Sequence, residues 1–174
     1  KSSKEVIQML VDIVSKNGNL LLNVVQTPEG DIEEDVLRIL DQIGTWIKDN
    51  GEGIYGTRPW KVYGEGPSTT EAQEKGQYGG LKEVRPYQST DIRYTRKGND
   101  IYVFCMEKPG GVVSLKSLGM NAGLLDGNIA SVSMPSHKGR IQWSHSAQSL
   151  DIQIPSDLPD YDVIMFKIST KINK

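Results

Sequence analysis

Apolar residues recur at helical spacing in two segments near the start of the chain. In the first, Ser2 and Glu5 lie three residues apart ahead of apolar positions, as in a capping box, and Asn17-Gly18 is suited to end the helix. The second begins with an acidic first turn at residues 31–35 and ends at Asn50-Gly51. Its apolar stripe consists of Val36, Ile39, Leu40, Ile43, Trp46 and Ile47. The pattern predicts two amphipathic helices.

Between these helices, residues 20–25 are apolar or amide without alternation. Such a run is typical of a strand that is covered on both faces, as in a parallel sheet. One strand cannot form a sheet alone, so we expect the strand at residues 19–25 and its two helices to be the tail of a (β/α)8, TIM-like barrel. The stripe of the second helix, including Trp46, is then expected to pack on that barrel.

The pattern changes after residue 54. Glycine, proline and small polar residues dominate to about residue 86, which predicts a connector packed on the barrel. Beyond it the period becomes two, and Lys97-Gly98-Asn99-Asp100 has the composition of a hairpin turn. Strands are expected in seven segments, near residues 92–97, 101–106, 112–118, 129–134, 140–144, 150–154 and 163–169. The sequence therefore predicts an α/β plus all-β chain with a barrel end at 1–58, a connector at 59–86 and an antiparallel β-sandwich at 87–174.

Composition excludes several roles. The formal net charge is −2 with 24% charged residues, so no basic field favours nucleic acid or an acidic membrane surface. No apolar run approaches the roughly 20 residues that span a bilayer. Cys105 is the single cysteine, so no intrachain disulfide can form, and its strand context favours a buried apolar role over a nucleophile.

Asn23 is the unusual residue of the expected strand, because a buried amide without hydrogen bonds costs about 1 to 3 kcal/mol. It could face the barrel axis near a catalytic end, or it could bond neighbouring strands and loops. Barrel sites lie at the carboxyl ends of strands, so we expect Asn23, Val25 and Gln26 in the neighbourhood of a substrate pocket. Residues 50–60 would then lie at the opposite face. Glu52, which stands there, is accordingly not expected to be catalytic, and neither is Glu65.

Other residues are candidates for metal ligands, for a catalytic triad and for a sugar-stacking surface. His137 and His145 lack the spacing of metal ligands, so no metal site is expected. Ser144, His145 and Asp151 could be drawn as a triad, but no Gly-x-Ser-x-Gly elbow is present. Trp143 and Tyr161 could stack on sugar rings, although a core position or an inter-domain position is favoured for large aromatic side chains.

Three motifs, in this order, resemble the C-terminal part of the glycoside hydrolase family 29 α-L-fucosidases. They are residues 10–23 (LVDIVSKNGNLLLN), residues 50–60 (NGEGIYGTRPW) and residues 91–98 (DIRYTRKG). Residues 114–119 and 163–168 agree more loosely with strands of that family's C-terminal sandwich. After Leu-Leu-Asn many members continue with an apolar residue and Gly-Pro, whereas this chain has Val24-Val25-Gln26-Thr27-Pro28.

The resemblance implies a retaining hydrolase of terminal α-L-fucose that uses a carboxylate nucleophile and a second carboxyl group as acid/base. Both groups of such enzymes precede the matched motifs, so the resemblance implies no catalytic residue in this chain, no cofactor and no metal. It also implies that the fragment is inactive without the N-terminal catalytic portion, acts on fucosylated glycans with it, and is secreted, periplasmic or lysosomal. The alternative is a non-catalytic carbohydrate-binding or scaffolding β-sandwich module. The buried strand and two helices argue against that alternative.

Overall fold

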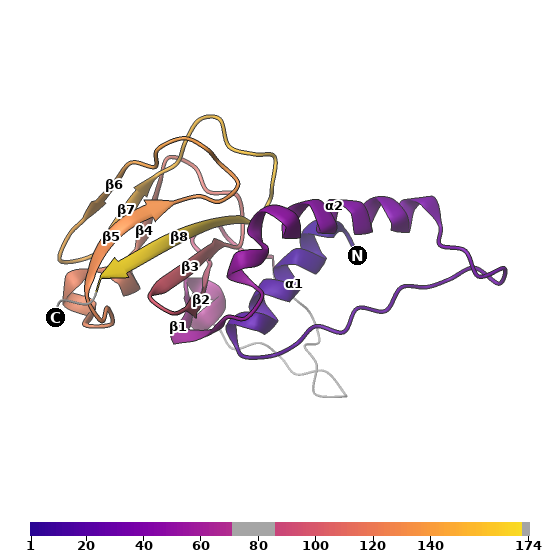
Figure 1. Ribbon diagram of the computed structural model, residues 1–174, viewed down its shortest axis with the longest axis horizontal. Helices are drawn as coiled ribbons and strands as arrows, with labels where there is room; N and C mark the ends of the chain where they lie inside the picture. Colours follow the sequence, from indigo (N-terminus) through magenta and orange to yellow (C-terminus); the bar gives the residue numbers. More distant parts are fainter. Residues whose placement is uncertain (71–85, 172–174) are drawn as a thin grey trace.

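The computed structural model describes residues 1–70 and 86–171. These residues form two packed sheets with two long helices on the outside of the larger one (Figure 1). The helices are α1 (Ser3–Ser15), α2 (Glu34–Asn50) and the short α3 (Pro67–Thr70), with 3₁₀ turns η1 (Gly51–Gly53), η2 (Lys116–Leu118) and η3 (Met120–Ala122). The strands are β1 (Arg58–Glu65), β2 (Ile92–Lys97), β3 (Asp100–Cys105), β4 (Val112–Leu115), β5 (Asn128–Ser133), β6 (Trp143–His145), β7 (Leu150–Gln153) and β8 (Ile164–Lys171).

The sheets form the predicted antiparallel β-sandwich. One has the order β1-β2-β3-β8-β5 and the other β4-β7-β6, and every described pairing is antiparallel. The hairpin between β2 and β3 is confirmed, with Lys97 opposite Asp100 and Gly98 at a φ of +60°. Each of the seven segments predicted as strands overlaps one, although β6 (Trp143–His145) shares only two residues with the predicted segment at 140–144. Period-two patterning is a strong signal where one face is buried.

The larger sheet is buried on both faces. Side chains of β3 alternate, with Ile101, Val103 and Cys105 in the core between the sheets and Tyr102 and Phe104 in a second cluster with the helices. The second cluster also contains Val6, Ile7, Val11, Ile43, Trp46, Ile54, Met106, Val163 and Met165. The sheet therefore serves as a wall common to two apolar cores.

Both predicted helices are present, but α2 begins at Glu34, late in the acidic first turn predicted at residues 31–35. Ser2 and Glu5 form the capping box of α1, and α1 ends before Asn17, which adopts a φ of +68°. The indole of Trp46 packs near the ring of Phe104 and donates to the carbonyl of Val163 at 2.8 Å. The expectation that Trp46 contacts a barrel is therefore wrong in this structure, because its indole lies against the β-sandwich.

The expected strand at residues 19–25 is absent. The segment has no regular structure, and Leu21 and Val25 are 89% and 78% exposed. The physical reason is that a strand needs a neighbouring strand for its backbone hydrogen bonds, and none lies beside this segment in the described part of the chain. We call residues 19–33 the arm, since they extend away from the sheets before α2 begins (Figure 1).

The expected connector is also corrected in its first part. Residues 58–65 are β1, which pairs with β2 at the edge of the larger sheet, so this stretch is part of the sandwich. The sequence pattern did not predict β1 because Pro59 and Gly64 are both unfavourable in strands. The register of the pairing shifts between these two residues. Residues 71–85 of the expected connector lie outside the described residues. Among the described residues, no helix combines the length and apolarity needed to cross a bilayer.

Candidate functional site

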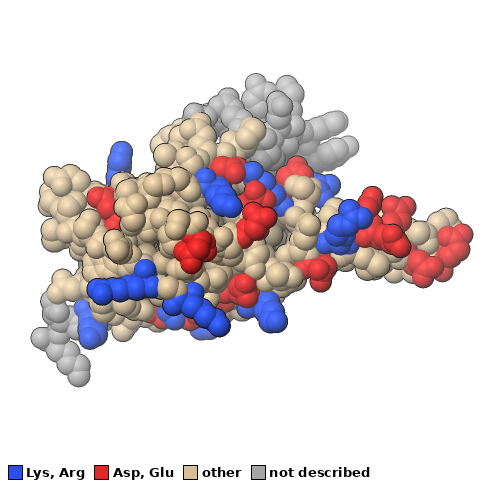
Figure 2. Space-filling model, turned by 90° about the horizontal axis from the view of Figure 1, so that it is seen from above, with Lys and Arg blue, Asp and Glu red and all other residues tan. Residues whose placement is uncertain are grey.

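The arm holds the three residues expected near a substrate pocket. Asn23, Val25 and Gln26 are all exposed and are brought together only by their proximity in sequence. Beyond them the chain reverses, with the Thr27 amide donating to the Asp31 carbonyl at 2.8 Å. Acidic residues gather at this end of the molecule (Figure 2), and those of the arm and the start of α2 are Glu29, Asp31, Glu33, Glu34 and Asp35.

A hollow of about 670 Å³ lies where the arm leaves the helices. Apolar side chains of both helices line it, including Leu10 and Val14 from α1 and Ile43 and Ile47 from α2, and Leu20 and Leu22 of the arm lie at its border. Its lining residues include no Asp, Glu or His. This hollow is suited to an apolar covering segment, and neither a carboxylate nor an imidazole lines it.

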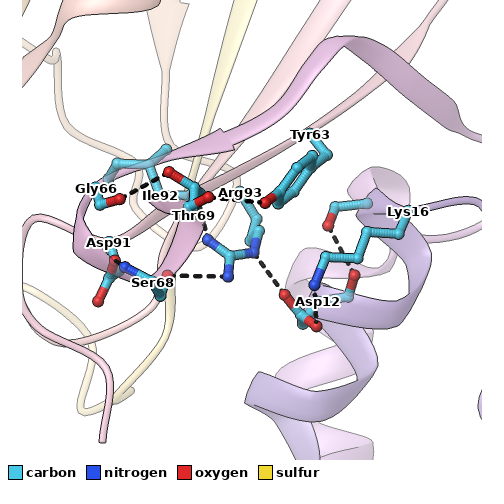
Figure 3. Close-up of polar contacts among 10 residues, drawn as sticks. Asp12, Lys16, Tyr63, Gly66, Ser68, Thr69, Asp91, Ile92 and Arg93 are labelled. Carbon is cyan, nitrogen blue, oxygen red and sulfur yellow. Dashed lines mark hydrogen bonds and ion pairs between the residues drawn. The ribbon is translucent and has the colours of Figure 1, made fainter. Parts of the chain in front are cut away.

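The three sequence motifs that resemble one family meet at the joint between α1 and the larger sheet. Arg93 of β2 has a side chain only 2% exposed, and its Nε donates to Oδ1 of Asp12 in α1 at 2.6 Å (Figure 3). Nη1 and Nη2 donate to the Ile92 carbonyl at 2.9 Å and to Ser68 Oγ at 3.0 Å. We call Asp12 and Arg93, with the groups that contact them, the Arg93 joint.

Two tyrosine rings complete this joint. The guanidinium carbon of Arg93 lies 5.5 Å from the ring centroid of Tyr63 and 5.4 Å from that of Tyr87, within the range of cation–π contacts. Burial raises the pKa of the Tyr87 hydroxyl to about 12. Lys16 also binds Asp12, at 2.8 Å. The joint is an ion pair with a buried guanidinium and a partly exposed carboxylate, and it fixes the helical segment to the sandwich.

The second motif joins the third beside it. Thr95 Oγ1 of β2 donates to the carbonyl of Gly53 at 2.7 Å, and the ring of Trp60 lies 5.1 Å from that of Tyr94. A Cβ on Gly53 would come within 2.3 Å of Met165 Sδ, so only glycine allows η1 to approach the sheet this closely. The residues of these two motifs that contact one another therefore hold η1 and β1 against β2, and their role here is structural.

Glu52 and Glu65, which were not expected to be catalytic, both have structural partners. Glu52 accepts hydrogen bonds from Tyr102 at 2.8 Å and from Lys167 at 2.5 Å, and the bond from Lys167 is the main reason that its pKa lies below the ordinary value. Glu65 accepts from the amides of Lys116 and Ser117 at 3.1 and 2.8 Å and so caps η2.

Ser144, His145 and Asp151 do not form a catalytic triad. Ser144 lies opposite Asp151, but His145 lies opposite Leu150, and adjacent residues of a strand point to opposite faces. His145 Nε2 lies 2.8 Å from the carbonyl oxygen of Leu118. His137 Nδ1 lies 3.9 Å from Asp157. No cluster of three His, Cys, Asp or Glu suited to a metal ion occurs among the described residues.

Cys105, Tyr161 and Trp143 differ in exposure. Burial raises the pKa of the Cys105 thiol to about 12, in keeping with its expected apolar role. Tyr161 donates to Asp49 Oδ2 at 2.6 Å and thereby ties the chain before β8 to α2. Trp143 remains exposed on β6.

Sequence reasoning assigned no role to Asp12 or Arg93. They stand 81 positions apart, and a charged residue in a strand ordinarily points to solvent. One signal in the sequence could have found Arg93. It stands between Ile92 and Tyr94, and a charged residue flanked by apolar residues in a buried strand needs a buried partner.

Comparison with known proteins points to the same family as the sequence motifs. The family model described as Alpha-L-fucosidase matches residues 1–52. Human tissue alpha-L-fucosidase is 29% identical over 141 residues, which are 80% of this chain and 24% of that protein. The mouse tissue alpha-L-fucosidase is 27% identical over 172 residues, which are 98% of this chain and 32% of that protein.

Solved structures show the same relationship. The Thermotoga maritima alpha-fucosidase in complex with a mechanism-based inhibitor superposes with a TM-score of 0.69 at 27% identity, over 97% of this chain and 34% of that chain. The chain thus spans between a quarter and a third of the length of these relatives. In sequence and in structure, the chain is therefore similar to one part of the alpha-L-fucosidases, which are glycoside hydrolases.

Proposed function

We propose that this chain is the C-terminal part of a retaining α-L-fucosidase that removes terminal α-L-fucose from glycoconjugates. The nucleophile and the acid/base, both carboxyl groups, belong to an N-terminal catalytic portion outside this sequence. The observation that carries the proposal is the alignment with the Thermotoga maritima enzyme, which accounts for 97% of this chain but only 34% of that one. The present chain contributes barrel closure and the sandwich.

The arm and α2 supply the barrel part of this proposal. Leu21, Val25 and Leu37 are all exposed apolar residues. Covering Leu21 or Val25, which are 89% and 78% exposed, contributes about 1.5 to 3 kcal/mol each, and covering Leu37, which is 49% exposed, contributes less. In the complete enzyme, residues 19–25 form a strand between two strands of the N-terminal portion, which supplies their hydrogen-bond partners. Residues 1–57 are thus the barrel end, and the sandwich starts with β1.

Asn23, Val25 and Gln26 then lie at the carboxyl end of that strand, where barrel enzymes bind substrate. Glu52 lies at the opposite end, held by Tyr102 and Lys167. Gln26→Ala should therefore alter kcat/KM on an α-L-fucoside more than Glu52→Ala does. The reverse ranking would show that the arm is remote from the site.

Hydrolysis of 4-nitrophenyl α-L-fucoside tests the whole proposal. We expect no turnover by the 174-residue chain and turnover after it is combined with the segment that precedes it in the complete protein. Turnover by the isolated chain would place catalytic carboxylates within it and refute the proposed division of roles. Absence of turnover in the combined sample, with both parts folded by circular dichroism, would refute the activity.

A further inference from the structure

We propose that the β6 edge of the smaller sheet binds a saccharide chain, with the indole of Trp143 as its stacking surface. Trp143 is 37% exposed, whereas the other two tryptophans, Trp46 and Trp60, are 1% and 7% exposed. A partly exposed indole at a sheet edge offers an apolar ring face to a ligand. Sugar rings present such a face of C–H groups, and their hydroxyl groups need hydrogen-bond partners around it.

The register explains why Trp143 stays open. It lies opposite Ile152, whose side chain is in the core, but β6 ends the sheet order β4-β7-β6, so no further strand covers its outer side. Two hollows meet at this strand and share Trp143 and Gln142 in their linings. One, of about 550 Å³, is completed by Arg140 and Ile141.

The other hollow, of about 350 Å³, lies along the outward face of the sheet. It is lined by Val112, Gln142, Trp143, Ser144, Asp151 and Gln153. Strand pairing brings these residues together. Gln153 is opposite Val112 in β4, and its backbone N–H donates to the Gln142 carbonyl at 2.9 Å. An oligosaccharide could therefore contact both sides of the Trp143 edge.

The polar groups around Trp143 suit sugar hydroxyls. The side chains of Gln142, Ser144 and Arg140 make no hydrogen bond or ion pair within the described structure, so their donors and acceptors are available. A glutamine amide can both donate and accept, and a guanidinium offers five N–H donors. Addition of a peptide strand is less well supported, because β6 has only three residues, Trp143–His145, with which to form backbone hydrogen bonds.

Affinity electrophoresis of the full chain in native gels containing gastric mucin tests the inference, with enzymatically deglycosylated mucin as the matched probe. We expect glycosylated mucin to retard the chain and deglycosylated mucin to leave it unretarded. Trp143→Ala should weaken retardation about tenfold or more, and Trp143→Phe should keep part of it. Tyr55→Ala, which removes another exposed aromatic ring, should bind normally.

Oligosaccharides released from the same mucin provide a second readout. Because Trp143 is the exposed tryptophan, they should shift the emission of the wild-type chain and leave that of Trp143→Phe unchanged. Equal retardation by both mucins would indicate recognition of protein and overturn the inference. So would no retardation, or full binding by a folded Trp143→Ala chain. None of these readouts depends on fucoside hydrolysis, so they stand apart from the proposed activity.

Discussion

Replacing Asp12 with alanine measures how strongly the Arg93 joint ties α1 to the sheet. The change leaves a guanidinium that is 2% exposed without its carboxylate, and Ser68 and a backbone carbonyl then remain as hydrogen-bonding contacts. Loss of one partner from a buried ion pair costs about 3 to 5 kcal/mol. The Asp12 side chain is 21% exposed, so water reaches the site and the lower end, about 3 kcal/mol, is expected.

A double-mutant cycle isolates this interaction from general damage to α1. In an Arg93→Met chain the buried charge is gone, so Asp12→Ala should cost only about 0.5 kcal/mol, the scale of an exposed pair with Lys16. The coupling energy should thus be about 2.5 kcal/mol, measured by urea denaturation at pH 7. Lys16→Ala is the control and should cost less than about 1 kcal/mol. A coupling below about 0.5 kcal/mol would refute the view that this pair holds the joint.

Further predictions concern the two cores and one ion pair. Trp46→Ala should lower the free energy of unfolding by about 3 to 5 kcal/mol, through a cavity beside Phe104, and Trp46→Phe should cost less; an unchanged melting temperature for Trp46→Ala would contradict this. Cys105 should not react with a thiol reagent at pH 8 until the chain is unfolded, because burial raises its pKa to about 12, and rapid labelling of folded chain would show an open sheet. The Glu52 carboxyl has its pKa lowered below 4.5 by Lys167, so its contribution to stability is present above pH 4.5 and is lost as the pH falls through the lower, folded value. The stability of Glu52→Gln should therefore fall less steeply with acid than that of the wild type in this range, and parallel curves would argue against the effect.

The sandwich could be predicted because alternation is a local property of the chain. Residues 101–105 are apolar at every position, yet they form most of β3, and its two sets of side chains enter different cores. β1 escaped prediction because Pro59 and Gly64 are poor strand residues, and pairing with β2 overrode that preference. The strand expected at residues 19–25 requires neighbours, which no local pattern can supply.

The site was harder to predict, because its contacts join distant residues. The family resemblance selected the motifs that contain Asp12 and Arg93, but spacing along the chain carries no information on a pair 81 residues apart. His145 illustrates the reverse case. Its neighbours in sequence suggested a triad, and strand geometry then separated it from Ser144 and Asp151.

The wall between the two cores has a consequence for how this chain can change during evolution. Phe104 and Cys105 are adjacent in sequence yet belong to different cores, so a one-residue insertion in β3 would send each set of side chains to the opposite face. Tyrosine and phenylalanine would then have to fit where valine and cysteine now pack. Substitutions on one face of β3 can be compensated within one core, but length changes in this strand would have to be accommodated by both cores at once. The sandwich is therefore not a cassette that could be exchanged between proteins without its helices.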